Sequence, residues 1–275
     1  MSRIGERFAR LRAAGRKALV PFVTAGDPTP QATVPLLHAM VAAGADLLEL
    51  GVPFSDPMAD GPVIQRASER ALAQGMTLHG VLDLVREFRR DDADTPLLLM
   101  GYLNPVEAFG YREFAAAAAA AGVDGLLTVD APPEEAEALV AALRGAGLDP
   151  IFLLAPTSDG ARIRRICALA SGFVYYVSVA GVTGSATLDL AAVQARLGAI
   201  RAETGLPLGV GFGISDAAAA AAIGRVADAV IVGSALVKRV EANLEHPERI
   251  APEVCGLLAE MRAALDAPVR TPEEA

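Results

Sequence analysis

The chain has 275 residues, of which 53% are hydrophobic, 21% charged and 5% aromatic, with a formal net charge of −9. This composition is too apolar for a disordered chain, and the length suits one or two domains. The acidic balance argues against nucleic-acid and anionic-membrane binding, and no apolar run reaches the ~18 residues of a membrane span.

The arginine-rich amino-terminal segment is the first predicted element. Ile4, Phe8 and Leu11 form an apolar stripe at helical spacing, and Glu6 is unusual in a transit peptide. We therefore expect an integral helix in front of the first strand, not a targeting segment.

Short apolar runs then alternate with longer segments of helical periodicity, such as residues 31–43 and 78–89. Most of the runs are continuous, which is typical of parallel strands covered on both faces. Eight such units predict one (β/α)8 TIM barrel over residues 1–275, with an extra amino-terminal helix. The pattern favours this barrel over a doubly wound sheet. The expected strands are residues 18–23, 46–50, 97–100, 125–128, 151–154, 173–178, 208–211 and 229–232.

Glycine-bearing loops follow the last three expected strands, at residues 179–185, 212–216 and 233–234. Barrels of this kind often bind phosphate there, because glycine lets the backbone approach a ligand and helix amino-termini present free N–H groups. None of these loops contains Lys or Arg. We expect backbone amides and Ser234 to hold the anion, although ordinary turns also favour glycine.

Two carboxylates are candidates for chemistry at the same end of the barrel. Glu49 lies among leucines near the end of the second strand, and Asp60 lies in the long loop that follows. Carboxyl groups in different environments can be driven apart in pKa, so that one donates and one accepts a proton. The alternatives are a structural ion pair for Glu49 and a turn or cap for Asp60.

Other catalytic groups are scarce in the sequence. The only lysines, Lys17 and Lys238, do not lie at the carboxyl ends of strands, and the three histidines stand singly. Schiff-base, pyridoxal phosphate and metal chemistry are therefore disfavoured, which leaves acid–base catalysis by carboxylates. Cys167 and Cys255 are far apart, without a CxxC motif, so we expect buried thiols and a cytoplasmic location.

The segment at residues 48–65, LELGVPFSDPMADGPVIQ, resembles the signature of the tryptophan synthase α subunit family. Further stretches at residues 21–28, 100–105, 180–184 and 211–215 are similar to that family in the same order, so the resemblance spans essentially the whole chain. It implies cleavage of indole-3-glycerol phosphate to indole and glyceraldehyde 3-phosphate. It also implies an α2β2 complex whose β subunit carries pyridoxal phosphate, with no cofactor in this chain.

The resemblance also implies roles for individual residues. Glu49 would be the main acid–base group, and Asp60 would accept the indole N–H hydrogen bond. Thr183 would lie in a loop that closes the site, and Val179 stands where some members carry Arg. The implied indole pocket contains Phe22, Met100, Tyr102, Leu127 and Phe212, with Tyr175 beside the catalytic group; Gly184, Gly213, Gly233 and Ser234 would bind phosphate; Pro53 and Asp56 would face the β subunit.

Three alternatives stay open at this stage. A sugar-phosphate isomerase or epimerase would use the same phosphate loops, but residues 155–157 offer no second acid or base after strand five. A non-enzymatic scaffold would have no use for Glu49 and Asp60. A stand-alone lyase that releases indole would look the same in sequence.

Overall fold

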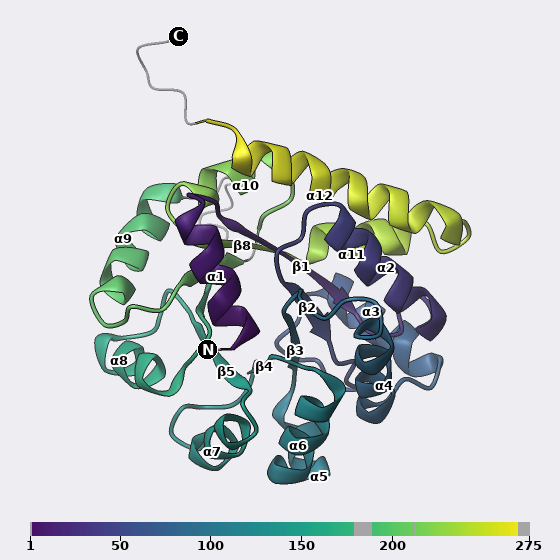
Figure 1. Ribbon diagram of the computed structural model, residues 1–275, viewed down its shortest axis with the longest axis horizontal. Coiled ribbons are helices and arrows are strands. Elements are labelled where there is room, and N and C mark those ends of the chain that lie inside the picture. The colour runs from purple at the N-terminus through teal and green to yellow at the C-terminus, as the bar shows by residue number, and fades with distance from the viewer. Residues whose placement is uncertain (1, 179–188, 212, 269–275) are drawn as a thin grey trace.

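The computed structural model describes residues 2–178, 189–211 and 213–268, and within them eight parallel strands close into a barrel in sequential order (Figure 1). The predicted TIM barrel is confirmed. The strands are β1 (Ala18–Thr24), β2 (Leu48–Gly51), β3 (Leu97–Gly101), β4 (Gly125–Thr128), β5 (Asp149–Leu154), β6 (Val174–Val177), β7 (Leu208–Gly211) and β8 (Ala229–Val232).

Helices surround the barrel and cover its outer face (Figure 1). Those described are α1 (Arg3–Ala13), α2 (Pro30–Ala42), α3 (Pro62–Ala73), α4 (Leu78–Phe88), α5 (Leu103–Phe109), α6 (Tyr111–Ala121), α7 (Glu137–Gly145), α8 (Gly160–Leu169), α9 (Leu190–Arg201), α10 (Ala217–Gly224), α11 (Ser234–Ala242) and α12 (Ile250–Asp266), with the 3-10 turn η1 (Pro247–Arg249). None of the helices in the described part of the chain is both long and apolar enough to cross a membrane.

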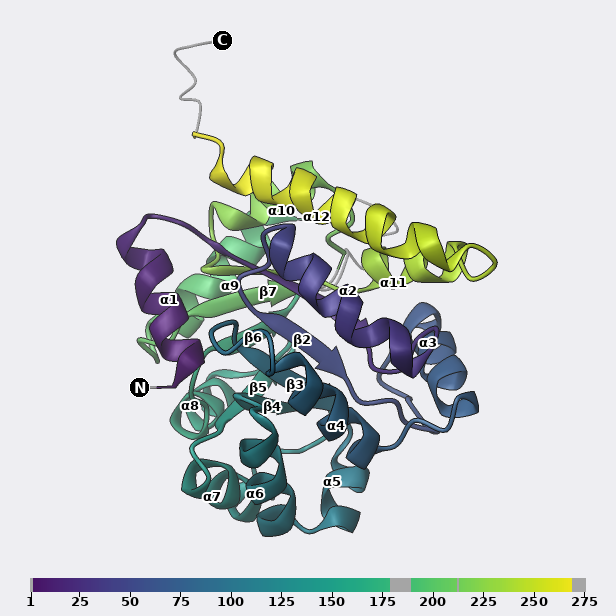
Figure 2. The same ribbon diagram turned by 45° about the vertical axis from the view of Figure 1, so that its right-hand side comes forward.

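The expected amino-terminal helix is present as α1, in front of β1. Figure 2 shows α1 at the end of the barrel where the strands begin. Its buried stripe of Ile4, Phe8 and Leu11 joins the apolar cluster of the barrel interior, and Arg3 donates to Asp124 at the start of β4 over 2.7 Å. The helix therefore plugs the amino-terminal end and leaves the opposite end open for a site.

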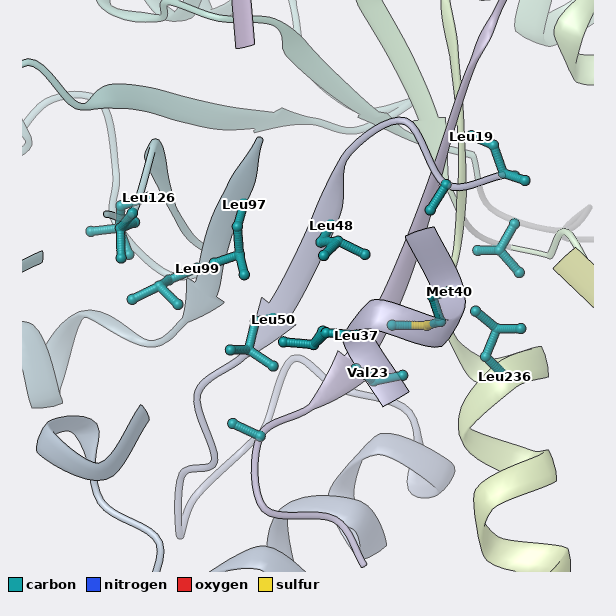
Figure 3. Packing of buried hydrophobic residues seen from close by; sticks show 14 of the residues in the cluster. Leu19, Val23, Leu37, Met40, Leu48, Leu50, Leu97, Leu99, Leu126 and Leu236 are labelled. Carbon is teal, nitrogen blue, oxygen red and sulfur yellow. The ribbon is translucent and has the colours of Figure 1, made fainter. Parts of the chain in front are cut away.

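Side chains alternate between the two faces of each strand, and this alternation separates two apolar layers. Outward residues such as Leu48 and Leu50 pack against Leu37 and Met40 of α2 (Figure 3). Inward residues form a second cluster that fills the barrel. An inward charged side chain must therefore lie in an apolar interior, as Glu49 does.

Three aspartates tie neighbouring strands together at the amino-terminal end. Asp46, Asp124 and Asp228 each precede a strand and accept the backbone N–H at the start of the strand before it, over 2.8–2.9 Å. Each carboxylate also pairs with an arginine, as Asp46 does with Arg262 over 2.9 Å. These repeated contacts stabilise the amino-terminal end of the barrel, opposite the carboxyl ends of the strands.

The structure departs from the expected elements in a few places. Strand β2 begins at Leu48, two residues later than expected, and β5 begins at Asp149, two residues earlier than expected. Cys167 and Cys255 are half-buried, not buried. None of these differences alters the barrel.

Candidate active site

A cavity of about 370 Å³ opens at the carboxyl end of the strands. The inward residues Phe22, Met100, Leu153 and Ile231 give it largely apolar walls, and Glu49 lies among them. Its full lining is Phe22, Glu49, Ala59, Asp60, Gly61, Ile64, Met100, Val129, Leu153, Tyr175, Val177, Gly213, Ile214, Ser215, Ile231, Gly233, Ser234, Ala235, Lys238 and Arg239. The cavity suits a flat apolar ring with a polar or charged extension.

Glu49 is a buried acid at this cavity. Its register beside Phe22 of β1 and Leu98 of β3 turns its side chain inward, and the residue is only 1% exposed. Neither carboxyl oxygen has a hydrogen-bond partner among the described residues. Burial, with a smaller contribution from the negative charge of Asp60, raises its pKa to about 8. Glu49 is thus a neutral acid at neutral pH.

Asp60 reaches the cavity from the loop between β2 and α3. Tyr102 donates its phenolic O–H to the Asp60 carboxylate over 3.1 Å, and the Tyr102 oxygen accepts the N–H of Ala59 over 2.9 Å. Gln65 of α3 donates to the carbonyls of Pro57 (3.2 Å) and Asp60 (3.0 Å). Burial raises the pKa of Asp60, while the Tyr102 hydrogen bond opposes that rise. Tyr102 therefore contacts the side chain of Asp60, and Gln65 contacts its backbone.

Two glycines make room for the aromatic side chains of the site. A Cβ on Gly211 would lie 2.1 Å from the Tyr175 hydroxyl oxygen, and one on Gly51 would lie 2.6 Å from the Phe22 ring. Burial, with the nearby charge of Glu49, raises the pKa of Tyr175, so its phenol keeps its proton. Both rings thus occupy space that any other residue at these positions would fill.

The far end of the cavity is suited to an anion. Gly213, with φ +75°, lies beside Gly233 and Ser234, and Ser234 is the first residue of α11. Lys238 and Arg239, one turn further along α11, also line the cavity. No cation was expected here, but Lys238, four residues after Ser234, lies on the same helix face and lines the cavity.

Proteins of a known family are similar to this chain in sequence and in fold. The family model for the tryptophan synthase alpha chain matches residues 8–266. A tryptophan synthase alpha chain from Thioalkalivibrio sulfidiphilus is 68% identical over 97% of this chain and 100% of that relative. The chain belongs to the tryptophan synthase alpha chain family. Membership confirms the predicted activity, cleavage of indole-3-glycerol phosphate, and implies a β-subunit partner.

Solved structures of tryptophan synthase superpose closely on the barrel. Tryptophan synthase subunit alpha from Legionella pneumophila has a TM-score of 0.91 at 46% identity and covers 97% of this chain and 99% of that one. An aminoacrylate-bound tryptophan synthase from M. tuberculosis has a TM-score of 0.86 at 37% identity, over 96% and 100%. The fold and the family are therefore established along essentially the whole chain.

Most of the residues expected from the tryptophan synthase resemblance meet at one cavity. Its lining includes Phe22, Glu49, Asp60, Met100, Tyr175, Gly213, Gly233 and Ser234. Tyr102 lines a small adjoining hollow together with Asp60. Thr183, Gly184 and Phe212, as well as Val179, lie outside the described residues.

Two expected positions differ from the prediction. Leu127 does not line the cavity but lies deeper in the barrel interior, and Val129, two residues later on the same face, lines it instead. Pro53 was expected to be exposed, yet it is buried; Asp56 is exposed. The exposed large hydrophobic residue of this loop is Met58, 87% exposed. Val129, Leu153 and Lys238 also line the cavity and belong to no recognised motif, whereas Ile64 lies in the segment at residues 48–65 but had no expected role.

Proposed function

We propose that Glu49 cleaves indole-3-glycerol phosphate by giving and then regaining one proton. The observation that carries this proposal is the buried, neutral carboxyl of Glu49 in an otherwise apolar cavity. A group with a pKa near the working pH can both donate and accept protons efficiently. No group of three or more His, Cys, Asp or Glu in the described ranges is placed to hold a metal ion.

The proposed steps balance without a net change in Glu49. The neutral carboxyl protonates C3 of the indole ring, which weakens the bond from C3 to C3′ of the glycerol chain. The Glu49 carboxylate then takes the proton of the C3′ hydroxyl while that carbon becomes an aldehyde, and the electron pair of the broken bond returns to the ring. Indole and glyceraldehyde 3-phosphate form, and Glu49 is again neutral.

Asp60 supports the same reaction from the opposite side of the ring. Protonation at C3 places positive charge on the ring nitrogen, and a carboxylate that accepts the N–H hydrogen bond stabilises this charge. The hydrogen bond from Tyr102 favours the ionised form of Asp60. The two carboxyl groups therefore have different roles: Glu49 is the neutral acid, and the Asp60 carboxylate accepts the indole N–H hydrogen bond.

We assign the substrate phosphate to the amino-terminal end of α11. Backbone N–H groups at Gly213, Gly233 and Ser234 would donate to it, and the helix dipole favours a negative charge there. Lys238 adds a full positive charge at the edge of the cavity. The ring and the phosphate would then occupy opposite ends of the same cavity.

We infer an α2β2 assembly in the cytoplasm, with pyridoxal phosphate bound only by the β subunit. The surface proposed for the β subunit is the loop between β2 and α3, where Asp56 and Met58 are exposed. An exposed methionine is an adaptable contact for a partner protein. The same loop ends at Asp60, so its partner would touch the segment that carries a proposed catalytic residue.

The protonation state of Glu49 tests the proposed mechanism. With glutamate side-chain carboxyls labelled with ¹³C, one resonance should titrate near pH 8, neutral below and ionised above, and it should be missing from Glu49→Gln. Glu203→Gln, which changes a partly exposed glutamate far from the cavity, should keep it. Titration of every glutamate below pH 6 would remove the neutral acid from the mechanism.

A further inference from the structure

Four charged residues form a network beside the mouth of the cavity. Arg70 donates through Nε (2.7 Å) and Nη2 (2.9 Å) to the two oxygens of Asp27, whose side chain is 2% exposed. Its third nitrogen, Nη1, reaches Glu241 over 3.2 Å. Arg66 binds both oxygens of Glu241, over 2.5 and 2.8 Å. We call Asp27, Arg66, Arg70 and Glu241 the mouth network.

The mouth network joins three elements that build different parts of the site. Asp27 follows β1, and the two arginines lie on α3, which begins two residues after Asp60. Glu241 lies on α11, which begins at Ser234 and carries Lys238 one turn later, both at the cavity. The network therefore links the phosphate end to the helix that follows the Asp60 loop.

Helix α3 also contacts the loop that carries Asp60. Gln65, next to Arg66 on α3, donates to the backbone carbonyls of Pro57 and Asp60. A shift of α3 relative to α11 would pull on these two hydrogen bonds and displace Asp60. The geometry thus connects the phosphate end to Asp60 through contiguous hydrogen-bonded groups.

Glu241 is ionised at neutral pH. The hydrogen bond from Arg66 is the largest influence on Glu241, and with Arg70 it lowers the pKa of Glu241 to about 2. Burial raises the pKa of Asp27, and the hydrogen bonds and charge of Arg70 oppose that rise. Two bidentate arginine–carboxylate pairs also fix direction as well as distance, as a positioning device requires.

We propose that the mouth network couples phosphate binding at α11 to the placement of Asp60, with its four members acting as positioning residues. The inference rests on the proposed function of the cavity. A structural role alone would change the stability of the barrel and would affect all substrates equally. A coupling role makes the catalytic benefit of the phosphate group depend on Glu241.

The test compares two substrates that differ only in the phosphate. We would measure kcat/KM for indole-3-glycerol phosphate and for indole-3-glycerol, and take their ratio. In Glu241→Gln this ratio should fall at least about five-fold, the lower end of typical coupling between sites. Lys238→Gln should also lower it, because it removes a charge at the phosphate end. The control is Glu203→Gln, which removes a glutamate that pairs with one arginine, Arg164 (3.6 Å), and should keep the ratio within about two-fold.

Arg66→Gln provides a second variant with less risk to folding, because its side chain is 48% exposed and Asp27 keeps its partner. It should lower the ratio in the same direction by a smaller factor. If Glu241→Gln and Arg66→Gln fold normally and reduce kcat/KM equally for both substrates, or leave both unchanged, the coupling is overturned. Normal cleavage by the unmodified chain in that experiment would leave the proposed function intact.

Discussion

Replacing Glu49 with glutamine should remove most of the cleavage activity while leaving the barrel folded. Glutamine has the same shape but cannot give or regain a proton, and general acid–base groups contribute about 10²–10⁴-fold. Because the Glu49 oxygens have no hydrogen-bond partner among the described residues, the substitution breaks no such contact there. We therefore expect kcat to fall at least about 100-fold, measured as indole release from indole-3-glycerol phosphate.

The folded state of this variant needs its own measurement. Thermal unfolding should show that Glu49→Gln is at least as stable as the unmodified chain at pH 9. At that pH burial of an ionised Glu49 costs the unmodified chain free energy, and the variant avoids that cost. Below pH 4.5 the advantage should vanish, because the carboxyl is then neutral in both the folded and unfolded states. Activity of Glu49→Gln within a few-fold of the unmodified chain would exclude Glu49 as the acid–base group.

A tryptophan synthase β subunit should raise kcat for indole release by at least about ten-fold. Asp60 lies in the loop that also exposes Asp56 and Met58, so a partner bound to this loop would change how firmly Asp60 is held. A ten-fold effect needs only about 1.4 kcal/mol of preference for the ordered loop. The measurement is indole release by the chain titrated with β subunit.

Asp56→Ala should weaken this stimulation and leave the slow basal rate unchanged, because Asp56 is exposed and does not line the cavity. Asp91→Ala, an exposed aspartate after α4, is the matched control and should be stimulated like the unmodified chain. Equal stimulation of all three proteins would remove Asp56 from the contact. No stimulation of any of them would instead favour a stand-alone lyase that releases indole.

The barrel could be predicted from the sequence because the patterns that specify its strands and helices are local. Continuous apolar runs, each followed by a helical segment, specify parallel strands wherever they occur, and the carboxyl ends of such strands meet at one place. Glu49 could be recognised because an acid among leucines is costly unless it is used. Its raised pKa, however, depends on the closure of the whole barrel around it, which no local pattern contains.

Depth within the barrel and contacts between distant segments could not be predicted in the same way. Alternation gives the face of a strand but not the depth. The family resemblance placed Leu127 in the pocket, whereas Val129 lines the cavity. Lys238 was not expected at the site because it belongs to a helix and not to a loop. It lies one helical turn after Ser234, however, and therefore also lines the cavity. The pair between Arg70 and Glu241 joins residues 171 positions apart and becomes visible only in three dimensions.

Indole formation by the purified chain tests the central claim, that this cavity cleaves indole-3-glycerol phosphate, most directly. The chain is incubated alone with indole-3-glycerol phosphate, and indole and glyceraldehyde 3-phosphate are both quantified over time. The cleavage proposed here predicts that the two products appear in equal amounts and that the rate falls as the pH rises through about 8, where Glu49 loses its proton. Consumption of the substrate without indole, as an isomerase would produce, or no reaction with or without a β subunit, would contradict it.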